Sequence, residues 1–245
     1  MDKKWEETFK LWAKMGEYKR RIREARENIR AVLEKEKCIV LYSGGKDSSV
    51  VLHLCMQIDR RTPVYFFNAG YDYKSEQMKM PTKVMAEIIE NAKSYGAKHI
   101  YICGGKGPSS KQFFGHLVEL KRKLGVEVEL LGIRKEESIT RKIRARRDGL
   151  VQCEGGRRVC FLIKDLSWMD VWAYIVSNGM HYLSIYDKYA KVLGWDKARF
   201  TMLFSRGLMH MGGSYYVDGV LFPEFRNLVA EQPPIPEILK RRDNQ

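Results

Sequence analysis

The chain has 245 residues, of which 44% are hydrophobic and 30% are charged. This composition can build the core of one large α/β domain or two small ones, and it excludes an intrinsically disordered chain. Lys and Arg total 44 against 30 Asp and Glu, a formal net charge of +14, which indicates an anionic partner. No apolar run approaches the roughly 18 residues of a membrane helix, and the first residues lack the apolar stretch of a signal peptide. We therefore expect a cytoplasmic protein that does not use a membrane.

The cysteines are expected to be reduced thiols. Their number is odd and most of them lie inside apolar runs, which argues against a disulfide framework. No C-x-x-C pair is present, so the usual spacing of a zinc or iron–sulfur site is missing and we assign no metal-ligating residues. Cys153 and Cys160 could meet across a hairpin, but two ordinary strand cysteines are the preferred interpretation. The five positions are Cys38, Cys55, Cys103, Cys153 and Cys160.

Hydrophobic periodicity predicts the elements in chain order. Residues 1–37 show one long amphipathic pattern, which predicts a long N-terminal helix. Short apolar runs at 38–42, 64–67, 99–103 and 128–133 predict strands, and the segments 48–58, 76–94 and 111–123 between them predict helices. Strands that alternate with helices form βαβ units. The predicted fold is therefore α/β, an open and mostly parallel sheet with helices on both faces.

The pattern becomes less regular after residue 148. The Gly-rich segment 148–158 predicts a hairpin turn that leads into a strand at 159–163, and 167–177 predicts a helix. Trp168, Val171 and Trp172 fall on one face of that helix, so we expect them to pack, with Asp170 pinning a basic group. A further strand is predicted at 215–217. The expected organisation is an N-terminal helix (1–37), an α/β domain (38–190) and an irregular C-terminal extension (191–245) packed on the same domain.

The most informative segment is Ser43-Gly44-Gly45-Lys46-Asp47-Ser48-Ser49, between a predicted buried strand and a predicted helix. Two glycines let a backbone turn tightly and approach an anion closely. The serine hydroxyls and the first N–H groups of the helix then point at that anion, and Lys46 adds a full positive charge. The alternative is a Gly-Gly turn with Ser48 as a helix cap. We favour a phosphate-binding loop because strand, loop and helix occur together.

This segment resembles the PP-loop of the ATP pyrophosphatase superfamily, and three further pieces resemble its phosphoadenosine phosphosulfate (PAPS) reductase family. Asn68-Ala69-Gly70-Tyr71 follows the second strand, where that family usually carries Asp-Thr-Gly-Tyr. Gly132-Ile133-Arg134-Lys135-Glu136-Glu137-Ser138 with Arg141 is similar to the family's Gly-x-Arg-x-x-Glu-Ser-x-x-Arg. Trp168–Ile175 and Tyr186-Asp187 are similar to its Trp-x-x-x-Asp-Val-Trp-x-Tyr-Ile and Leu-Tyr segments. The resemblance spans residues 38–190 and implies an adenine nucleotide alpha hydrolase-like fold.

The resemblance implies that ATP is bound and cleaved between its α and β phosphates, usually with Mg²⁺. Ser43, Gly44, Gly45, Lys46, Asp47 and Ser48 would hold the pyrophosphate, and Asn68, Ala69 and Gly70 would lie near the ribose or adenine. Arg134 and Arg141 would face the reacting phosphate and act with Lys46 in catalysis. Asn68 departs from the family's Asp and removes a charge, which leaves a weaker or lost turnover open. For Arg134, the alternative is an exposed helix start with Glu136 and Glu137 as first-turn acids.

Reduction of a sulfonucleotide is not expected. The reductases carry a nucleophilic cysteine in a C-terminal Glu-Cys-Gly-x-His motif, and this sequence has no cysteine after Cys160. Relatives of the same superfamily activate an acceptor for sulfur insertion, as in DNA phosphorothioation, and this is the preferred hypothesis. The alternatives are sulfate adenylylation by a protein like the small subunit of ATP sulfurylase, and a non-catalytic module that binds nucleotide or nucleic acid. A sulfur donor or a GTPase would be the protein partner, and the oligomeric state stays open.

The basic residues gather in one part of the sequence. Nine Lys or Arg and four acids lie between Arg134 and Arg158. We expect DNA or RNA, if it is bound, to contact Arg141–Arg158 and the C-terminal extension through backbone phosphates. The alternative is a solvated surface together with ATP-binding arginines.

Overall fold

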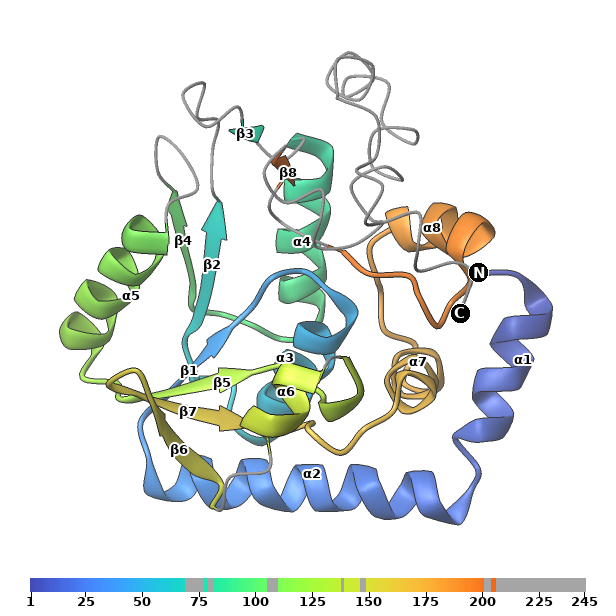
Figure 1. Ribbon diagram of the computed structural model, residues 1–245, viewed down its shortest axis with the longest axis horizontal. Coiled ribbons are helices and arrows are strands. Elements are labelled where there is room, and N and C mark those ends of the chain that lie inside the picture. Colours follow the sequence, from blue (N-terminus) through green and yellow to red (C-terminus); the bar gives the residue numbers. More distant parts are fainter. Residues whose placement is uncertain are drawn as a thin grey trace.

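A six-stranded sheet forms the centre of the molecule in the computed structural model (Figure 1), which describes residues 1–68, 77–78, 82–104, 110–137, 139–145, 149–200 and 204–205. The strand order is β4-β2-β1-β5-β7-β6, and every neighbouring pair is parallel except β6 with β7. The open, mostly parallel sheet is therefore confirmed. The strands are β1 (Cys38–Leu41), β2 (Val64–Asn68), β4 (Ile100–Gly104), β5 (Val128–Leu131), β6 (Val151–Glu154) and β7 (Arg157–Phe161).

The strand order reverses between β1 and β5. From β1 the chain adds β2 and β4 on one side, whereas β5 pairs with the other side of β1 and is followed by β7 and β6. The register sets Val40 beside Val64 of β2 and Cys38 beside Val128 of β5. In open α/β sheets, ligands bind in the crevice outside the carboxyl ends of the strands at such a reversal. The fold therefore points to the ends of β1 and β5.

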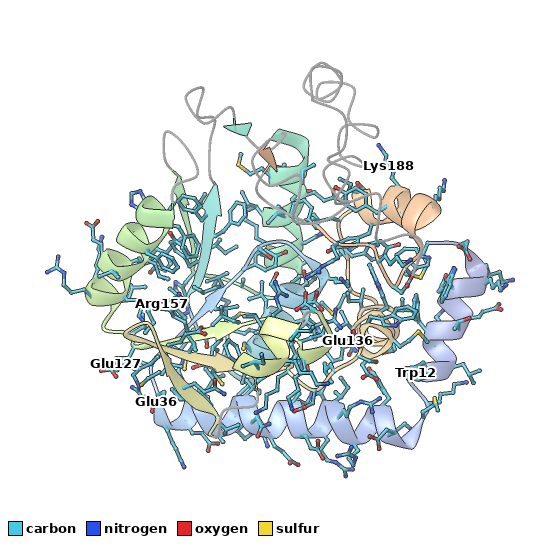
Figure 2. The ribbon with its side chains drawn as sticks, in the orientation of Figure 1. Trp12, Glu36, Glu127, Glu136, Arg157 and Lys188 are labelled. Atoms are coloured by element: carbon cyan, nitrogen blue, oxygen red, sulfur yellow. The ribbon has the colours of Figure 1, made fainter. Side chains whose placement is uncertain are left out.

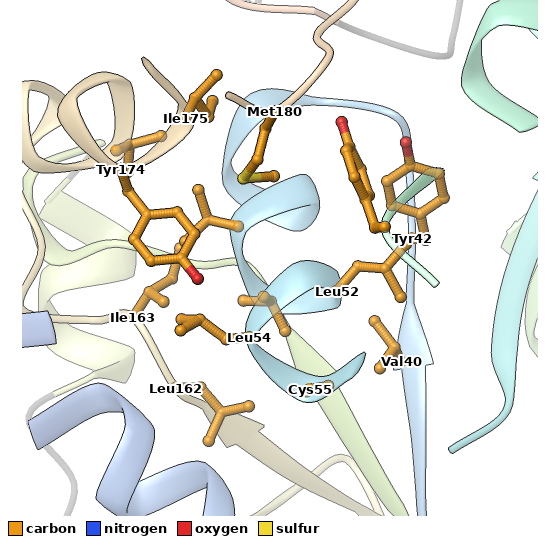
Figure 3. Close-up of a cluster of buried hydrophobic side chains, with 14 of the residues drawn as sticks. Val40, Tyr42, Leu52, Leu54, Cys55, Leu162, Ile163, Tyr174, Ile175 and Met180 are labelled. Atoms are coloured by element: carbon orange, nitrogen blue, oxygen red, sulfur yellow. The ribbon is translucent and has the colours of Figure 1, made fainter. Parts of the chain in front are cut away.

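Helices cover both faces of the sheet, as predicted. Ile39, Tyr65 and Phe67 pack with Leu117 and Leu120 on one face, whereas their neighbours along the strands join the main core on the other. Figure 3 shows part of that core, where Val40 of β1 lies near Leu52 and Leu54 lies on the side toward Tyr174. The helices of the domain are α3 (Lys46–Ile58), α4 (Thr82–Ser94), α5 (Ser110–Leu124), α6 (Ile139–Arg144), α7 (Trp168–Ser177) and α8 (Ile185–Leu193), with a 3₁₀ turn at Lys135–Glu137.

Two element predictions need correction. The helix predicted at 76–94 begins only at Thr82, and β3 (Gln77–Met78) pairs antiparallel with β8 (Phe204–Ser205). Pro81 in the sequence explains the late start, because a proline disfavours the helical conformation of the residue before it. The strand predicted at 215–217 lies outside the described residues. The division into 1–37, 38–190 and 191–245 remains a prediction.

The N-terminal pattern forms two helices rather than one. They are α1 (Lys3–Trp12) and α2 (Gly16–Lys35), and Met15 between them is extended, with φ −68° and ψ 140°. The two helices pack against different helices of the domain: α1 lies against α7, where Phe9 contacts the rings of Trp168 and Trp172, whereas α2 lies against α3. Figure 1 shows α1 along one side of the molecule and α2 along its lower edge. A straight helix could not reach both surfaces.

Asp170 joins these helices to α7, and the prediction that it pins a basic group is confirmed. Its side chain is fully buried, caps α7 together with Ser167, and accepts hydrogen bonds from Trp12 Nε1 at 2.8 Å and Arg21 Nη2 at 2.9 Å. Burial opposes ionisation, but Arg21 and the other donors hold the pKa of Asp170 below its ordinary value.

None of the helices in the described ranges combines the length and the apolar character needed to cross a bilayer.

None of the five cysteines, all of which lie in the described ranges, forms a disulfide. The β6–β7 register sets Cys153 opposite Arg158 and Cys160 opposite Val151, so the two cysteines are not cross-strand partners. Their interpretation as ordinary strand cysteines is therefore confirmed, and burial raises the pKa of Cys160 to about 12.

Candidate functional site

The loop between β1 and α3 lies at the predicted crevice. Gly44 has a positive φ of 79°, and a Cβ atom there would lie 2.4 Å from Cγ1 of Ile88. Both constraints favour glycine. Ser43 and Ser48 fix the rest of the turn: their hydroxyl oxygens are 2.9 Å apart, the Ser43 N–H donates to Ser48 Oγ, and that hydroxyl donates to the Gly45 carbonyl. The loop is therefore shaped by its own side chains before any ligand arrives.

The loop opens α3 at Lys46, with Gly45 in the N-cap position. The first N–H groups of a helix have no partner inside it, and the helix dipole gives this end a partial positive charge. One of them is held within the protein, since the Lys46 N–H donates to the Tyr186 hydroxyl at 3.0 Å. The end of α3 therefore presents donors and positive potential at the carboxyl edge of the sheet.

Gly132 brings the segment after β5 against this loop. A Cβ atom at Gly132 would lie 2.7 Å from both the Asp47 carbonyl carbon and the Ser48 nitrogen, closer than real Cβ atoms come. The two backbones can approach only because residue 132 lacks a side chain. This contact sets the position of the β5 loop, and with it the charged residues that follow, relative to the start of α3.

Lys46 is almost completely buried, with 2% of its side chain exposed. Its ammonium group donates to the Ala198 carbonyl at 3.1 Å, lies 3.4 Å from Asp47 Oδ2 and sits 5.8 Å from the centre of the Tyr186 ring. Burial lowers the pKa of Lys46, against the opposing effect of Asp47. The amine is thus held in place by the protein rather than extended into solvent.

Arg134 contacts Asp47 from outside the pocket lining. Its side chain is 4% exposed and its guanidinium donates to the carboxylates of Asp47 and Glu136. Burial opposes ionisation of Asp47, but Lys46 and Arg134 together hold the pKa of that carboxyl below its ordinary value. Arg134 therefore fixes the second residue of α3, and it is not among the side chains that line the pocket at the loop.

Glu137 organises the other arginines. Its carboxylate is 5% exposed and accepts from the Arg134 backbone N–H at 3.0 Å, from the guanidinium of Arg141, and from Arg199 Nη2 at 2.7 Å. Arg141 comes from α6, whereas Arg199 follows α8 and comes from the C-terminal extension. One carboxylate thus holds two guanidinium groups from separate parts of the chain.

These groups surround a polar pocket of about 130 Å³. Three cationic side chains and two carboxylates line it, and the end of α3 adds further positive potential, so the pocket suits an anionic group of phosphate type. Its lining consists of Ser43, Gly45, Lys46, Asp47, Ser48, Gly132, Glu137, Arg141, Tyr186, Arg199 and Phe200.

The structure brings most of the predicted site residues together. Ser43, Gly45, Lys46, Asp47, Ser48 and Arg141 line the pocket, Gly44 shapes the turn, and Arg134 supports Asp47. The side chain of Asn68 and the whole of Ala69 and Gly70 lie outside the described residues. Their roles in binding or catalysis remain predictions.

Sequence reasoning missed several pocket residues, with different signals available for each. Gly132 and Glu137 stand inside the motif around Arg134, and Tyr186 stands inside the Tyr-Asp segment, so closer attention to those motifs could have assigned them. Arg199 and Phe200 lie beyond every recognised motif. Only the folded chain brings them to the loop.

Several basic residues between Arg134 and Arg158 serve structural ion pairs. Arg157 binds the buried carboxylate of Glu129 on β5, with Nε 2.9 Å from Oε2, and Arg158 binds Glu36 at 2.7 Å and Glu127 at 2.6 Å. Arg157 and Arg158 begin β7, so these pairs lie at the amino edge of the parallel strands, away from the pocket. Figure 2 shows Arg157, Glu127 and Glu36 gathered there, apart from Glu136. Lys142, in the same basic segment, is exposed on α6.

The acids at the pocket do not form a resident magnesium site. Mg²⁺ needs oxygen ligands in near-octahedral geometry, but Asp47 is paired with Lys46 and Arg134, and Glu137 is paired with Arg141 and Arg199. Within the described ranges no three His, Cys, Asp or Glu side chains converge on one point.

Residues 37–198 match the model of the phosphoadenosine phosphosulfate reductase domain. The chain belongs to this family. The match covers about two-thirds of the chain and includes the loop, the segment after β5 and α7. A comparison with curated protein sequences finds no significant match.

Solved structures with a similar fold include an FMN adenylyltransferase and an FAD synthetase. The Candida glabrata FMN adenylyltransferase in complex with FAD and inorganic pyrophosphate has a TM-score of 0.55 at 13% identity, over 76% of this chain and 66% of that chain. The same enzyme with ATP has a TM-score of 0.53 at 13% identity, over 76% and 65%. Yeast FAD synthetase with FAD has a TM-score of 0.52 at 12% identity, over 76% and 70%. The chain spans about two-thirds of these proteins, and at this identity the similarity establishes the fold.

Proposed function

We propose that this PAPS reductase-family protein is an AMP-forming ATP pyrophosphatase that transfers an adenylyl group to an acceptor. The observation that carries the proposal is the pocket at the end of β1, where Lys46, Arg141 and the start of α3 converge on a space of phosphate size. Metal-bound ATP is the substrate. FMN adenylyltransferase, which has a similar fold, has been solved with ATP and with pyrophosphate, and this supports the proposal that the present fold binds a polyphosphate.

In the proposed reaction an acceptor oxygen attacks the α phosphorus, the bond from that phosphorus to the bridging oxygen breaks, and pyrophosphate leaves. Negative charge develops on the leaving pyrophosphate. Lys46, Arg141 and the N–H groups at the start of α3 would stabilise it, and fixed donors of this kind are worth several kcal/mol in a site shielded from water. Arg134 acts as a positioning residue, because it touches Asp47 rather than the pocket.

We further propose that the acceptor is a nucleic-acid phosphate activated for sulfur transfer, as in DNA phosphorothioate modification. The net charge of +14 and the exposed Lys142, one residue from the pocket arginine Arg141, support this acceptor. A sulfur nucleophile from a partner protein would then displace AMP. The pairing of Arg157 and Arg158 with acids removes these two residues from the expected contact surface, and the exposed Lys142 on α6 stays in it.

The test is to incubate the protein with ATP and Mg²⁺ alone, with DNA, with tRNA and with sulfate, and to quantify AMP and pyrophosphate. Stimulation by DNA that weakens steeply as salt rises supports the nucleic-acid acceptor. Stimulation by sulfate alone would replace it with sulfate adenylylation, which needs a GTPase partner in the relatives. ATP binding without turnover in every mixture, including one with a cell extract as the source of partners, would leave a nucleotide-binding module.

A further inference from the structure

The segment after α8 closes one side of the pocket. Ala198 accepts a hydrogen bond from the Lys46 ammonium at 3.1 Å, and Arg199 and Phe200 line the pocket. The family match ends at residue 198, so Arg199 and Phe200 belong to the part of this chain that the family domain does not include.

This segment is anchored before it reaches the pocket. The Trp195 ring packs edge-on against Trp172, with ring centres 4.7 Å apart, and the Trp195 carbonyl accepts from Trp172 Nε1 at 3.2 Å. Trp195 and Ala198 are buried. The backbone that carries Arg199 is therefore fixed by the core, and its side chain starts from a defined point at the pocket wall.

The contacts of Arg199 leave it suited to a second acceptor. One of its terminal nitrogens donates to Glu137 at 2.7 Å, and its side chain is 49% exposed. A guanidinium has five N–H donors in a planar fork, which lets it bind a carboxylate and a phosphate oxygen together. Glu137 also pairs with Arg141, so this one carboxylate is shared by two guanidinium groups at the pocket.

We propose that Arg199 is a phosphate-binding residue of this site, held by Glu137, and that it makes the pocket selective for ligands that carry a pyrophosphate group. The proposal deepens the proposed function and rests on the same pocket. Arg141 comes from α6 and Arg199 from the segment after α8, so two guanidinium groups from separate parts of the chain line the pocket beside Lys46. A pyrophosphate offers two phosphoryl groups to these cations, whereas AMP offers one.

The test is calorimetric titration of inorganic pyrophosphate, ATP and AMP into the wild type and four variants. We expect Arg199→Ala to weaken pyrophosphate and ATP binding at least tenfold, since a hydrogen bond to a charged group contributes about 1.5–3 kcal/mol, and to change AMP binding less than twofold. Arg199→Lys should fall in between, because an ammonium keeps the charge but not the fork. Glu137→Gln should weaken pyrophosphate binding by loosening both arginines. Lys197→Ala is the matched control, because it removes one positive charge from an exposed position two residues away.

Equal losses in Arg199→Ala and Lys197→Ala would overturn the proposal, because general charge would then explain them. Equal losses for AMP and ATP in Arg199→Ala would also overturn it. If the wild type forms AMP and pyrophosphate but Arg199→Ala keeps full affinity, the inference fails and the proposed function stands. If pyrophosphate binding depends on Arg199 but no AMP is ever formed, the inference stands and the proposed function fails.

Discussion

A methyl group at position 132 would clash with the backbone of the loop between β1 and α3. In Gly132→Ala the new Cβ would meet the Asp47 carbonyl carbon and the Ser48 nitrogen at 2.7 Å, whereas ordinary contacts begin at 3.4 Å. The β5 segment and the start of α3 must therefore separate by about 0.7 Å. Overpacking of this kind costs about 1–3 kcal/mol. A displacement near 1 Å in a positioned site can cost about a hundredfold in rate.

We therefore expect Gly132→Ala to lower the free energy of unfolding by about 1–3 kcal/mol and to weaken ATP binding at least tenfold. Urea denaturation measures the first and calorimetry the second. The control is Gly115→Ala on the exposed side of α5, where a Cβ meets no atom within 4 Å, and where alanine should be neutral or stabilising by up to about 1 kcal/mol. Unchanged ATP affinity in a folded Gly132→Ala protein would refute the assignment of the loop and the β5 segment to one site.

Three further predictions concern single side chains. Lys46→Ala should weaken binding of inorganic pyrophosphate at least tenfold by calorimetry, because it removes the buried cation of the pocket; unchanged affinity would exclude Lys46 from the anion site. Asp170→Asn should destabilise the fold by about 3 kcal/mol in urea, because it leaves Arg21 without its buried partner. Since the pKa of Asp170 is held below its ordinary value, its contribution is present above about pH 4 and is lost at lower pH. The variant should therefore lose stability less steeply than the wild type below pH 4, and parallel curves would contradict the pairing. Arg157→Ala should lower the free energy of unfolding and leave the salt dependence of DNA binding unchanged. Lys142→Ala should leave the free energy of unfolding unchanged and make DNA binding less dependent on salt. A weaker salt dependence in Arg157→Ala would assign Arg157 to the nucleic-acid surface.

Much of the sheet could be predicted from the sequence because each buried strand is a short apolar run between amphipathic segments. The loop could be predicted for a related reason, since Gly44 and Gly45 stand between a strand and a helix and few other structures use that order. The N-terminal pattern was harder to interpret. Apolar residues recur at helical spacing through residues 5–33, and the spacing does not show that α1 and α2 face different partners.

The remaining parts of the site depend on contacts between distant segments. Arg199 lies 62 residues after Glu137 in the sequence, yet the two side chains form an ion pair at the loop. No local pattern encodes that meeting, which depends on the packing of Trp195 against Trp172 of α7. The basic segment shows the same limitation: its charge density suggested one surface, but the sheet register directs Arg157 to Glu129 at the edge away from the pocket. Local periodicity predicts helices and strands. Which charged residues form structural ion pairs and which line the pocket depends on how distant segments pack.

The central claim is that the loop at Lys46 holds the pyrophosphate end of ATP while the α–β bond is cleaved. Phosphorus NMR of a mixture of protein, ATP, Mg²⁺ and the most stimulating acceptor identifies the broken bond directly. The account predicts AMP, free or attached to the acceptor, in equal amount to pyrophosphate, and the loss of both with folded Lys46→Ala. Formation of ADP and inorganic phosphate in a manner that depends on Lys46 would contradict it.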